Sequence, residues 1–401
     1  MTGEVARPPS ADKWLRVSRY LRQHHYELAA RIAAEYPPAA RVAGTPLLAV
    51  PAWRPPAPVP LDDITLEFRP DAPPPSAPDV AGLVPGALPE RADGTRYQRY
   101  SDVIGELAAP AVYENRPVYR LIEADLASAA GPRLAFGRGR YFDGADFTGP
   151  AGHEYAAAAL AALGPAEAEA DTPVDTATPL AALPSPAAGP CPYRAAIGGP
   201  TDLTGLVAMM ATCALTLRYD RATGTATFPL HYRQPGKVGH AAGMYTTIPV
   251  GVFQPSGEAP WNEANDFSLW RGLLREYAEE LLGADEDHGS EHAPIDYAAW
   301  PLAKAMTDGL TDGTVRAWCL GLGADPLTFA LDLLAVVVID APRYDDLFGD
   351  LVDDNAEGQV IKPRPFDAPS VTKLVRDAPL QAAAAALLTL ALAHRETLLA
   401  A

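Results

Sequence analysis

The chain has 401 residues, which is long enough for two domains that each bury a hydrophobic core. Its formal net charge of −18 argues against a general nucleic-acid binder, which needs a basic surface, and against attachment to anionic membranes. The three cysteines, Cys191, Cys213 and Cys319, show no metal-ligand spacing, so we expect reduced thiols in a cytoplasmic protein.

The first residues are polar and charged, and a signal peptide is therefore not expected. Residues 12–36 are predicted to be a helix, because Trp14, Val17, Leu21 and Leu28 recur at helical spacing. No second helix follows at the short turn that a helix-turn-helix motif requires. Direct contact with nucleic acid is therefore not expected.

Prolines dominate residues 46–89, and the alternating piece Ile64–Phe68 interrupts them. We expect that piece to be an edge strand and the prolines around it to form extended, wrapping chain. Beyond residue 97 the sequence again favours regular secondary structure. Residues 118–124 and 133–142 are predicted to be strands, and an alanine-rich helix is expected to start at His153.

The sequence Gly-Arg-Gly-Arg at residues 137–140 lies in the second of these strands. Backbone amides and guanidinium groups beside glycines can approach a phosphate closely. The alternative interpretation is a bulged or turned strand that exposes two arginines. A repeat this short does not decide between the two.

Residues 166–195 are rich in alanine and proline and have no stable apolar period, which is typical of a linker. It divides an N-terminal α+β region of unknown role, residues 1–165, from a C-terminal domain, residues 196–401. The most apolar runs, residues 331–339 and 380–393, are too short to cross a bilayer and are interpreted as core elements.

The C-terminal domain is predicted to open with a strand that ends near Tyr219. Asp220–Gly224 is a turn, and residues 225–232 return as the second strand of a hairpin. Residues 244–253 form the next strand and lead towards an acidic helix. After that helix, residues 285–292 are acidic and are expected to form a solvated loop. Beyond the loop we predict a helix at 299–310, strands at 316–323 and 329–340, and a closing helix at 370–399.

The acidic helix is predicted from five apolar residues at alternating steps of three and four. Asn265 or Asp266 can cap its beginning, and Gly283 can supply the left-handed residue that ends it. The apolar stripe consists of Phe267, Trp270, Leu274, Tyr277 and Leu281.

Glu276, Glu279 and Glu280 lie away from this stripe and place three carboxylates within five residues. Such charges repel one another in water, but Mg²⁺ or Mn²⁺ prefers oxygen ligands and would make their proximity favourable. The alternative is that the acids form the solvated face of an amphipathic helix, with Arg275 and Glu279 as an ordinary surface pair.

The stretch Arg275-Glu-Tyr-Ala-Glu-Glu-Leu-Leu-Gly283 resembles the core of the Nudix box, which Nudix hydrolases carry on a metal-binding helix. Gly257 and Glu263 have the spacing that the family shows upstream. Eleven residues separate Glu263 from Arg275 where the family has seven, and one extra residue precedes Gly283. Tyr277 also replaces an aliphatic residue, so the box is degenerate.

The order of hairpin, loop, strand and acidic helix is similar to the order in a Nudix domain. The resemblance covers roughly residues 200–400 and implies a C-terminal Nudix-like α/β/α sandwich with a mixed sheet. The fold class expected for the whole chain is α+β. The family's Pro-Gly-Gly is absent, and residues 248–251, Ile-Pro-Val-Gly, stand in its place.

By the same resemblance, the implied catalytic residues are Glu276, Glu279, Glu280 and Arg275, with the arginine orienting a glutamate. The implied ligands of Mg²⁺ (or Mn²⁺) are Glu276, Glu279 and Glu280. Glu263 is a weaker fourth ligand, because the inserted turn rotates it away from its expected place.

The resemblance implies a hydrolase that cleaves a diphosphate linkage in a nucleoside diphosphate derivative. The alternative is a catalytically inactive nucleotide sensor that acts in transcriptional regulation, which the stretched box and the large N-terminal region favour. A third hypothesis is that the protein is an interaction scaffold that contacts partners through its proline-rich segment. The expected partner is a nucleotide-type small molecule, a homodimer is left open, and no membrane partner is expected.

Overall fold

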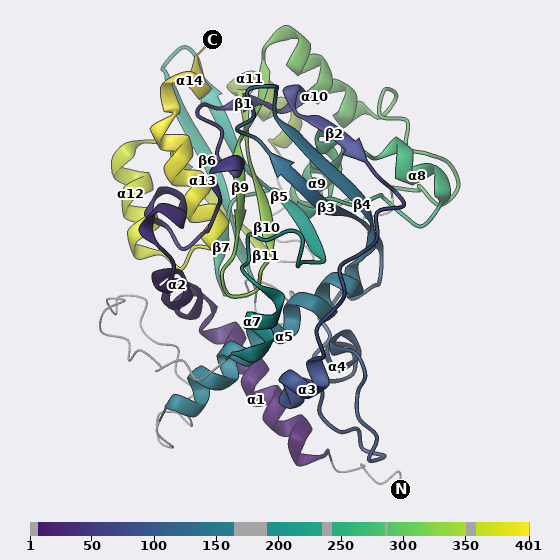
Figure 1. Cartoon of the computed structure of the whole chain (residues 1–401). Helices are drawn as coiled ribbons and strands as arrows, with labels where there is room; N and C mark the ends of the chain where they lie inside the picture. The colour runs from purple at the N-terminus through teal and green to yellow at the C-terminus, as the bar shows by residue number, and fades with distance from the viewer. Residues whose placement is uncertain (1–6, 164–190, 235–242, 285–287, 350–357, 401) are drawn as a thin grey trace, which may run out of the picture.

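The computed structural model describes residues 7–163, 191–234, 243–284, 288–349 and 358–400. Helices surround a mixed, curled β-sheet, which confirms the expected α+β class. Figure 1 shows α12, α13 and α14 at the left of the sheet and α8, α9 and α10 at its right, with α1, α3, α4, α5 and α7 below.

The centre of the sheet is β10 (Leu331–Asp340), in which every residue is buried. Its apolar run at residues 333–339 suits a strand that is covered on both faces. It pairs in parallel with β5 (Ala208–Asp220) and antiparallel with β9 (Val315–Ala324). β5 then turns at Asp220 and pairs with β6 (Thr225–Arg233), which confirms the predicted hairpin.

The main path of the sheet runs β1-β9-β10-β5-β3-β4-β2, and β6, β7, β8 and β11 branch from it. β2 lies at one edge, in parallel with β4, as expected for the piece within the proline-rich segment. The remaining strands are β1 (Val59–Pro60), β2 (Thr65–Phe68), β3 (Pro117–Asp125), β4 (Arg133–Arg140), β7 (Tyr245–Thr246), β8 (Val250–Val252) and β11 (Gly358–Pro365).

The helices pack against both faces of the sheet and against one another. Short 3-10 turns lie at Pro38–Ala40, Val42–Gly44, Pro51–Trp53, Leu61–Asp63 and Pro85–Ala87. The α-helices are α1 (Pro9–Gln23), α2 (His25–Glu35), α3 (Val80–Leu83), α4 (Tyr100–Leu107), α5 (Tyr141–Ala162), α7 (Pro192–Ile197), α8 (Pro260–Asn265), α9 (Leu269–Leu282), α10 (Pro301–Asp312), α11 (Ala341–Phe348), α12 (Ala368–Asp377), α13 (Ala382–Ala393) and α14 (Arg395–Leu399).

Strands from both sequence regions belong to the same sheet. β3 pairs with β5 through Arg120 and Leu121, and β1 pairs with β9. One hydrophobic cluster contains side chains from both regions, from Trp14 to Leu399. The predicted boundary at residues 166–195 lies mostly outside the described residues and stays a prediction about the sequence.

Three helical predictions differ from the structure. Residues 12–36 form two helices, α1 and α2, with a break at His24. α5 begins at Tyr141 rather than at His153, and it accommodates Pro150 within the helix. The predicted closing helix is three helices, α12 to α14, because the chain is extended at Ala378 and turns at His394. None of the described helices is both long and apolar enough to traverse a membrane.

Candidate functional site on the acidic helix

The acidic helix α9 has defined ends. The Ser268 hydroxyl accepts a hydrogen bond from the Arg271 amide at the beginning, so the cap is Ser268 rather than the predicted Asn265 or Asp266. The helix ends at Gly283, whose φ of 69° is left-handed, as predicted.

Four of the five residues of the predicted apolar stripe face the core from α9, whereas Phe267 precedes the helix and is half-buried. Trp270, Leu274, Tyr277 and Leu281 are all buried. The Tyr277 hydroxyl lies 2.7 Å from the Thr216 hydroxyl of β5, which fixes the helix on the sheet. A tyrosine at this position of the box therefore has a structural reason, since its ring fills the core and its hydroxyl finds a polar partner.

Arg275 is buried inside the protein, not on the surface. Its guanidinium donates hydrogen bonds of 2.6 Å to the Tyr297 hydroxyl and to the Gln254 carbonyl. Its Nη1 is also 3.6 Å from Oδ1 of Asp266. The alternative reading of a surface pair between Arg275 and Glu279 is therefore wrong, and Arg275 ties the helix to the segment that precedes α8.

Asp266 is the acidic partner of this buried arginine. It is fully buried, and its Oδ2 accepts hydrogen bonds from the Ser256 amide at 2.8 Å and the Ser256 hydroxyl at 2.6 Å. The Tyr297 hydroxyl donates to its Oδ1 at 2.8 Å. Asp266 thus joins three segments around Arg275, a role that its sequence position before the helix did not indicate.

Glu276 and Glu280 lie one turn apart on α9 and both meet β8. The Glu280 carboxylate is buried, and its Oε1 accepts a 2.9 Å hydrogen bond from the Val250 amide. Its Oε2 lies 3.8 Å from Nδ1 of the buried His231. Glu276 packs against Gly251, where an added Cβ would come within 1.8 Å of the carboxyl carbon. The structure therefore brings these two predicted residues together.

We predict that Gly251→Ala separates this carboxylate pair without unfolding the protein. The new methyl group would displace only the flexible end of Glu276, so the free energy of unfolding should change by less than about 1 kcal/mol. If Glu276 and Glu280 together bind Mg²⁺, the rise in melting temperature expected from that ion should be lost in this variant. Gly86→Ala, where an added Cβ meets nothing within 4 Å, is the matched control. An unchanged Mg²⁺ response in Gly251→Ala would contradict this arrangement.

Glu279 is held separately from that pair. Its Oε1 lies 3.0 Å from Nε2 of His288, whose ring packs on Trp300 with centroids 5.0 Å apart. His288 has a φ of 47°, which is unusual for a residue other than glycine.

Residues 285–292 were predicted to be a solvated loop. Residues 285–287 lie outside the described part, but Ser290 is fully buried and accepts hydrogen bonds from α8.

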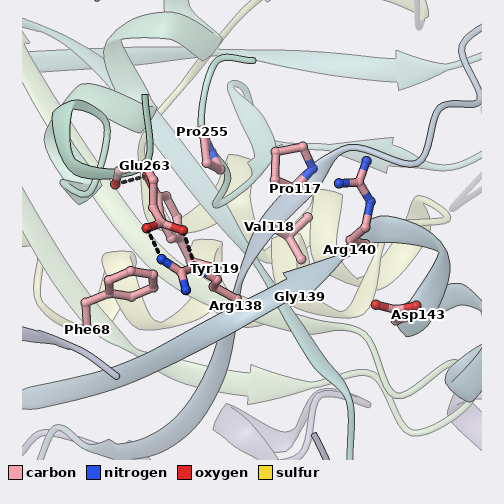
Figure 2. Close-up of a pocket in the computed structure, with 10 residues that line it drawn as sticks. All are labelled: Phe68, Pro117, Val118, Tyr119, Arg138, Gly139, Arg140, Asp143, Pro255 and Glu263. Carbon is pink, nitrogen blue, oxygen red and sulfur yellow. Dashed lines mark hydrogen bonds and ion pairs between the residues drawn. The ribbon is translucent and has the colours of Figure 1, made fainter. Parts of the chain in front are cut away.

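Glu263 is bound to an arginine from the other sequence region. Nε and Nη2 of Arg138 donate to its two carboxylate oxygens at 2.6 and 2.8 Å. This hydrogen-bonded guanidinium holds the pKa of the Glu263 carboxyl below its ordinary value. The Tyr119 hydroxyl also donates to the Glu263 carbonyl at 2.8 Å. Glu263 therefore faces β4, as drawn in Figure 2.

The donor chemistry of Glu276 and Glu280 suits Mg²⁺. Both offer carboxylate oxygens, and Mg²⁺ keeps several waters and is usually bound by only one or two carboxylates. The wider predicted set with Glu263 and Glu279 is not gathered. Within the part of the chain that the structure describes, no three or more His, Cys, Asp or Glu side chains are grouped to hold a metal ion.

The Gly-Arg-Gly-Arg sequence lies in β4, and its glycines make room for a third arginine. An added Cβ at Gly137 would be 3.0 Å from Nη2 of the buried Arg120, and one at Gly139 would be 3.1 Å from the Arg120 Cβ. Arg138 and Arg140 project from the strand towards α8 and the loop before it, where they pair with Glu263 and Glu258.

The sequence did not indicate that His231 and His288 lie next to the acidic helix. His231 lies in β6, and its only signal was a histidine within an otherwise alternating strand. His288 lay in a loop interpreted as solvated. Both contacts depend on the tertiary fold, since β6 and the loop reach α9 from different directions.

No protein-family model matches this chain, and no curated protein matches it either.

Proposed function

We propose that the C-terminal region is a Nudix-like α/β/α sandwich that hydrolyses a diphosphate linkage in a nucleoside diphosphate derivative, with Mg²⁺ or Mn²⁺. The observation that carries this proposal is that two carboxylates of α9 contact β8, Glu280 at the Val250 amide and Glu276 at Gly251. Gly251 is the glycine of the sequence that stands in place of the family's Pro-Gly-Gly. The order of hairpin, strand and acidic helix supports it further.

In this proposal Glu276 and Glu280 hold the divalent ion, which would neutralise phosphate charge and lower the pKa of a bound water. The Val250 amide fixes the Glu280 carboxylate by donating to Oε1. Glu279 could join the pair only by leaving His288, and Glu263 only by leaving Arg138. Arg275 is a positioning residue, because its hydrogen bonds hold α9 against the Gln254 carbonyl.

The second candidate is a Nudix-like nucleotide sensor without turnover, acting in transcriptional control. The engagement of Glu263 by Arg138 and of Glu279 by His288 favours it, because two of the four expected carboxylates are occupied by other partners. Ligand binding without product formation would distinguish the sensor from the hydrolase.

The test is a screen of nucleoside diphosphate sugars, dinucleotides and nucleoside triphosphates for hydrolysis with Mg²⁺ or Mn²⁺. We expect Glu276→Gln with Glu280→Gln to lower the rate at least a hundredfold, about 2.7 kcal/mol at 1.36 kcal/mol for each factor of ten. The fold should persist, since a glutamine oxygen can still accept from the Val250 amide.

The same double variant should lose its stabilisation by metal. A hundredfold excess of Mg²⁺ over Kd adds about 2.7 kcal/mol to the stability of a protein that binds it only when folded. The exposed Glu396→Gln on α14 is the control and should keep both activity and metal response. Equal Mg²⁺ responses in the wild type and the double variant would rule out the metal pair and, with it, the hydrolase.

A further inference from the structure

A cavity of about 330 Å³ lies between β4 and the segment that carries α8. Figure 2 shows Arg138 pointing towards Glu263, with Phe68 and Tyr119 near it. Arg140 lies further along the strand, on the side of Asp143, which also lines the cavity. This volume is at the lower end of the range of small-molecule sites, roughly 300–1,000 Å³. The cavity is built by both sequence regions and is distinct from the Glu276–Glu280 pair.

One part of the wall is aromatic and fixed. Tyr119 is buried, and its hydroxyl is anchored on the Glu263 carbonyl at 2.8 Å. Phe68 meets the Tyr119 ring edge-on, with centroids 5.9 Å apart, and Arg138 lies 6.0 Å from the Phe68 centroid. A planar ring from a ligand can pack against the half-buried Phe68 at low conformational cost, because contact with the buried Tyr119 already holds the Phe68 ring in place.

The other part of the wall carries two guanidinium groups from the same strand. Arg138 and Arg140 are two residues apart in β4 and therefore project to one side of it. Their side chains remain 57% and 43% exposed while they pair with Glu263 and Glu258. Exposed ion pairs of this kind contribute little net stability, so another anion can replace a carboxylate at low cost.

We propose that this cavity binds the nucleoside monophosphate part of a ligand. The phosphate would accept hydrogen bonds from Arg138 and Arg140, which guanidinium groups donate readily, and the base would pack on the half-buried ring of Phe68. Glu258, whose side chain is 64% exposed, would move into solvent as the phosphate takes its place on Arg140. The inference rests on the proposed function for its choice of ligand, but the binding needs neither metal nor turnover.

The test measures the Kd of AMP by calorimetry in buffer with EDTA. Arg138→Gln and Arg140→Gln should each weaken AMP binding at least tenfold. Glu258→Gln should tighten it at least threefold, because it removes the carboxylate that competes for Arg140. Arg91→Gln is the matched control, since Arg91 also pairs with a glutamate, Glu106, and lies on an aromatic ring, but outside the cavity.

Ribose 5-phosphate and inorganic phosphate are the comparison ligands, and both should bind at least fivefold more weakly than AMP. The proposal is overturned if wild-type protein binds AMP no more tightly than inorganic phosphate, or if the arginine variants bind it like Arg91→Gln. Glu276→Gln with Glu280→Gln should keep wild-type AMP binding. A protein that binds AMP through Arg138 but hydrolyses nothing would refute the hydrolase and leave this site standing.

Discussion

Arg275→Met is expected to lower the free energy of unfolding by about 3–5 kcal/mol, because it leaves a buried carboxylate without its cation. Asp266 is fully buried and lies 3.6 Å from the Arg275 guanidinium. The substitution also removes the donors to the Tyr297 hydroxyl and the Gln254 carbonyl. Urea unfolding monitored by circular dichroism would measure the change.

Two further variants identify the cause of that loss. Adding Asp266→Asn to Arg275→Met should recover part of the stability, since the amide carries no charge that needs a partner. Lys304→Met removes a cation from an exposed pair with Asp308 and should cost less than about 1 kcal/mol. If Arg275→Met behaved like Lys304→Met, the buried network would not be holding α9 in place.

Asp332→Asn is expected to stabilise the protein by up to about 4 kcal/mol at pH 8. Asp332 lies within the central strand β10, only 2% exposed, and its Oδ2 has no hydrogen-bond partner among the described residues. Burial, followed by the nearby Asp325 carboxylate, raises the pKa of Asp332 to about 7. An asparagine of the same shape would not have to ionise there.

The sign of the pH dependence follows from that pKa. Between about pH 4 and pH 7 the folded protein holds a proton at Asp332 that the unfolded chain has lost, so wild-type stability falls as pH rises through this window. About three pKa units at 1.36 kcal/mol each give the full difference of about 4 kcal/mol above pH 7. Near pH 4 the wild type and Asp332→Asn should be similarly stable.

Urea unfolding at pH 4.5, 6 and 8 would follow this difference. The exposed Asp62→Asn is the control and should track the wild type at each pH. An Asp332→Asn protein no more stable than wild type at pH 8 would mean that the ionised carboxylate finds a compensating partner in the fold.

The periodic elements were predictable from the sequence because the burial of apolar side chains determines them. Residues 333–339 of β10 are all apolar since the strand is covered on both faces, and the stripe from Trp270 to Leu281 marks the buried side of α9. The break in residues 12–36 and the early start of α5 at Tyr141 were not predictable in this way. They depend on packing between helices that lie far apart in the sequence.

The candidate site was predictable only in part, for a related reason. The spacing of Glu276 and Glu280 indicates a shared side of the helix, but not that Glu280 is buried on the Val250 amide. An apolar pattern indicates which side of a helix is buried. It does not indicate which carboxylate accepts a hydrogen bond from a backbone amide thirty residues away in the sequence. The Gly-Arg-Gly-Arg sequence left open a phosphate contact or a strand that exposes two arginines, and it gave no sign of the two glutamates that these arginines bind.

The sheet also has a consequence for the order of events during synthesis. Val59 of β1 pairs with Cys319 of β9, 260 positions later (319 − 59), and His25 contacts Asp325 across 300 positions. At about 5–20 residues per second, the early segments wait roughly 13–52 s for these partners. Contacts of such high sequence separation slow folding. The nascent β1 therefore stays unpaired until β9 is made, whereas β2, β3 and β4 can pair with one another much earlier. We expect chaperone demand and aggregation to concentrate in the interval before β9 is made.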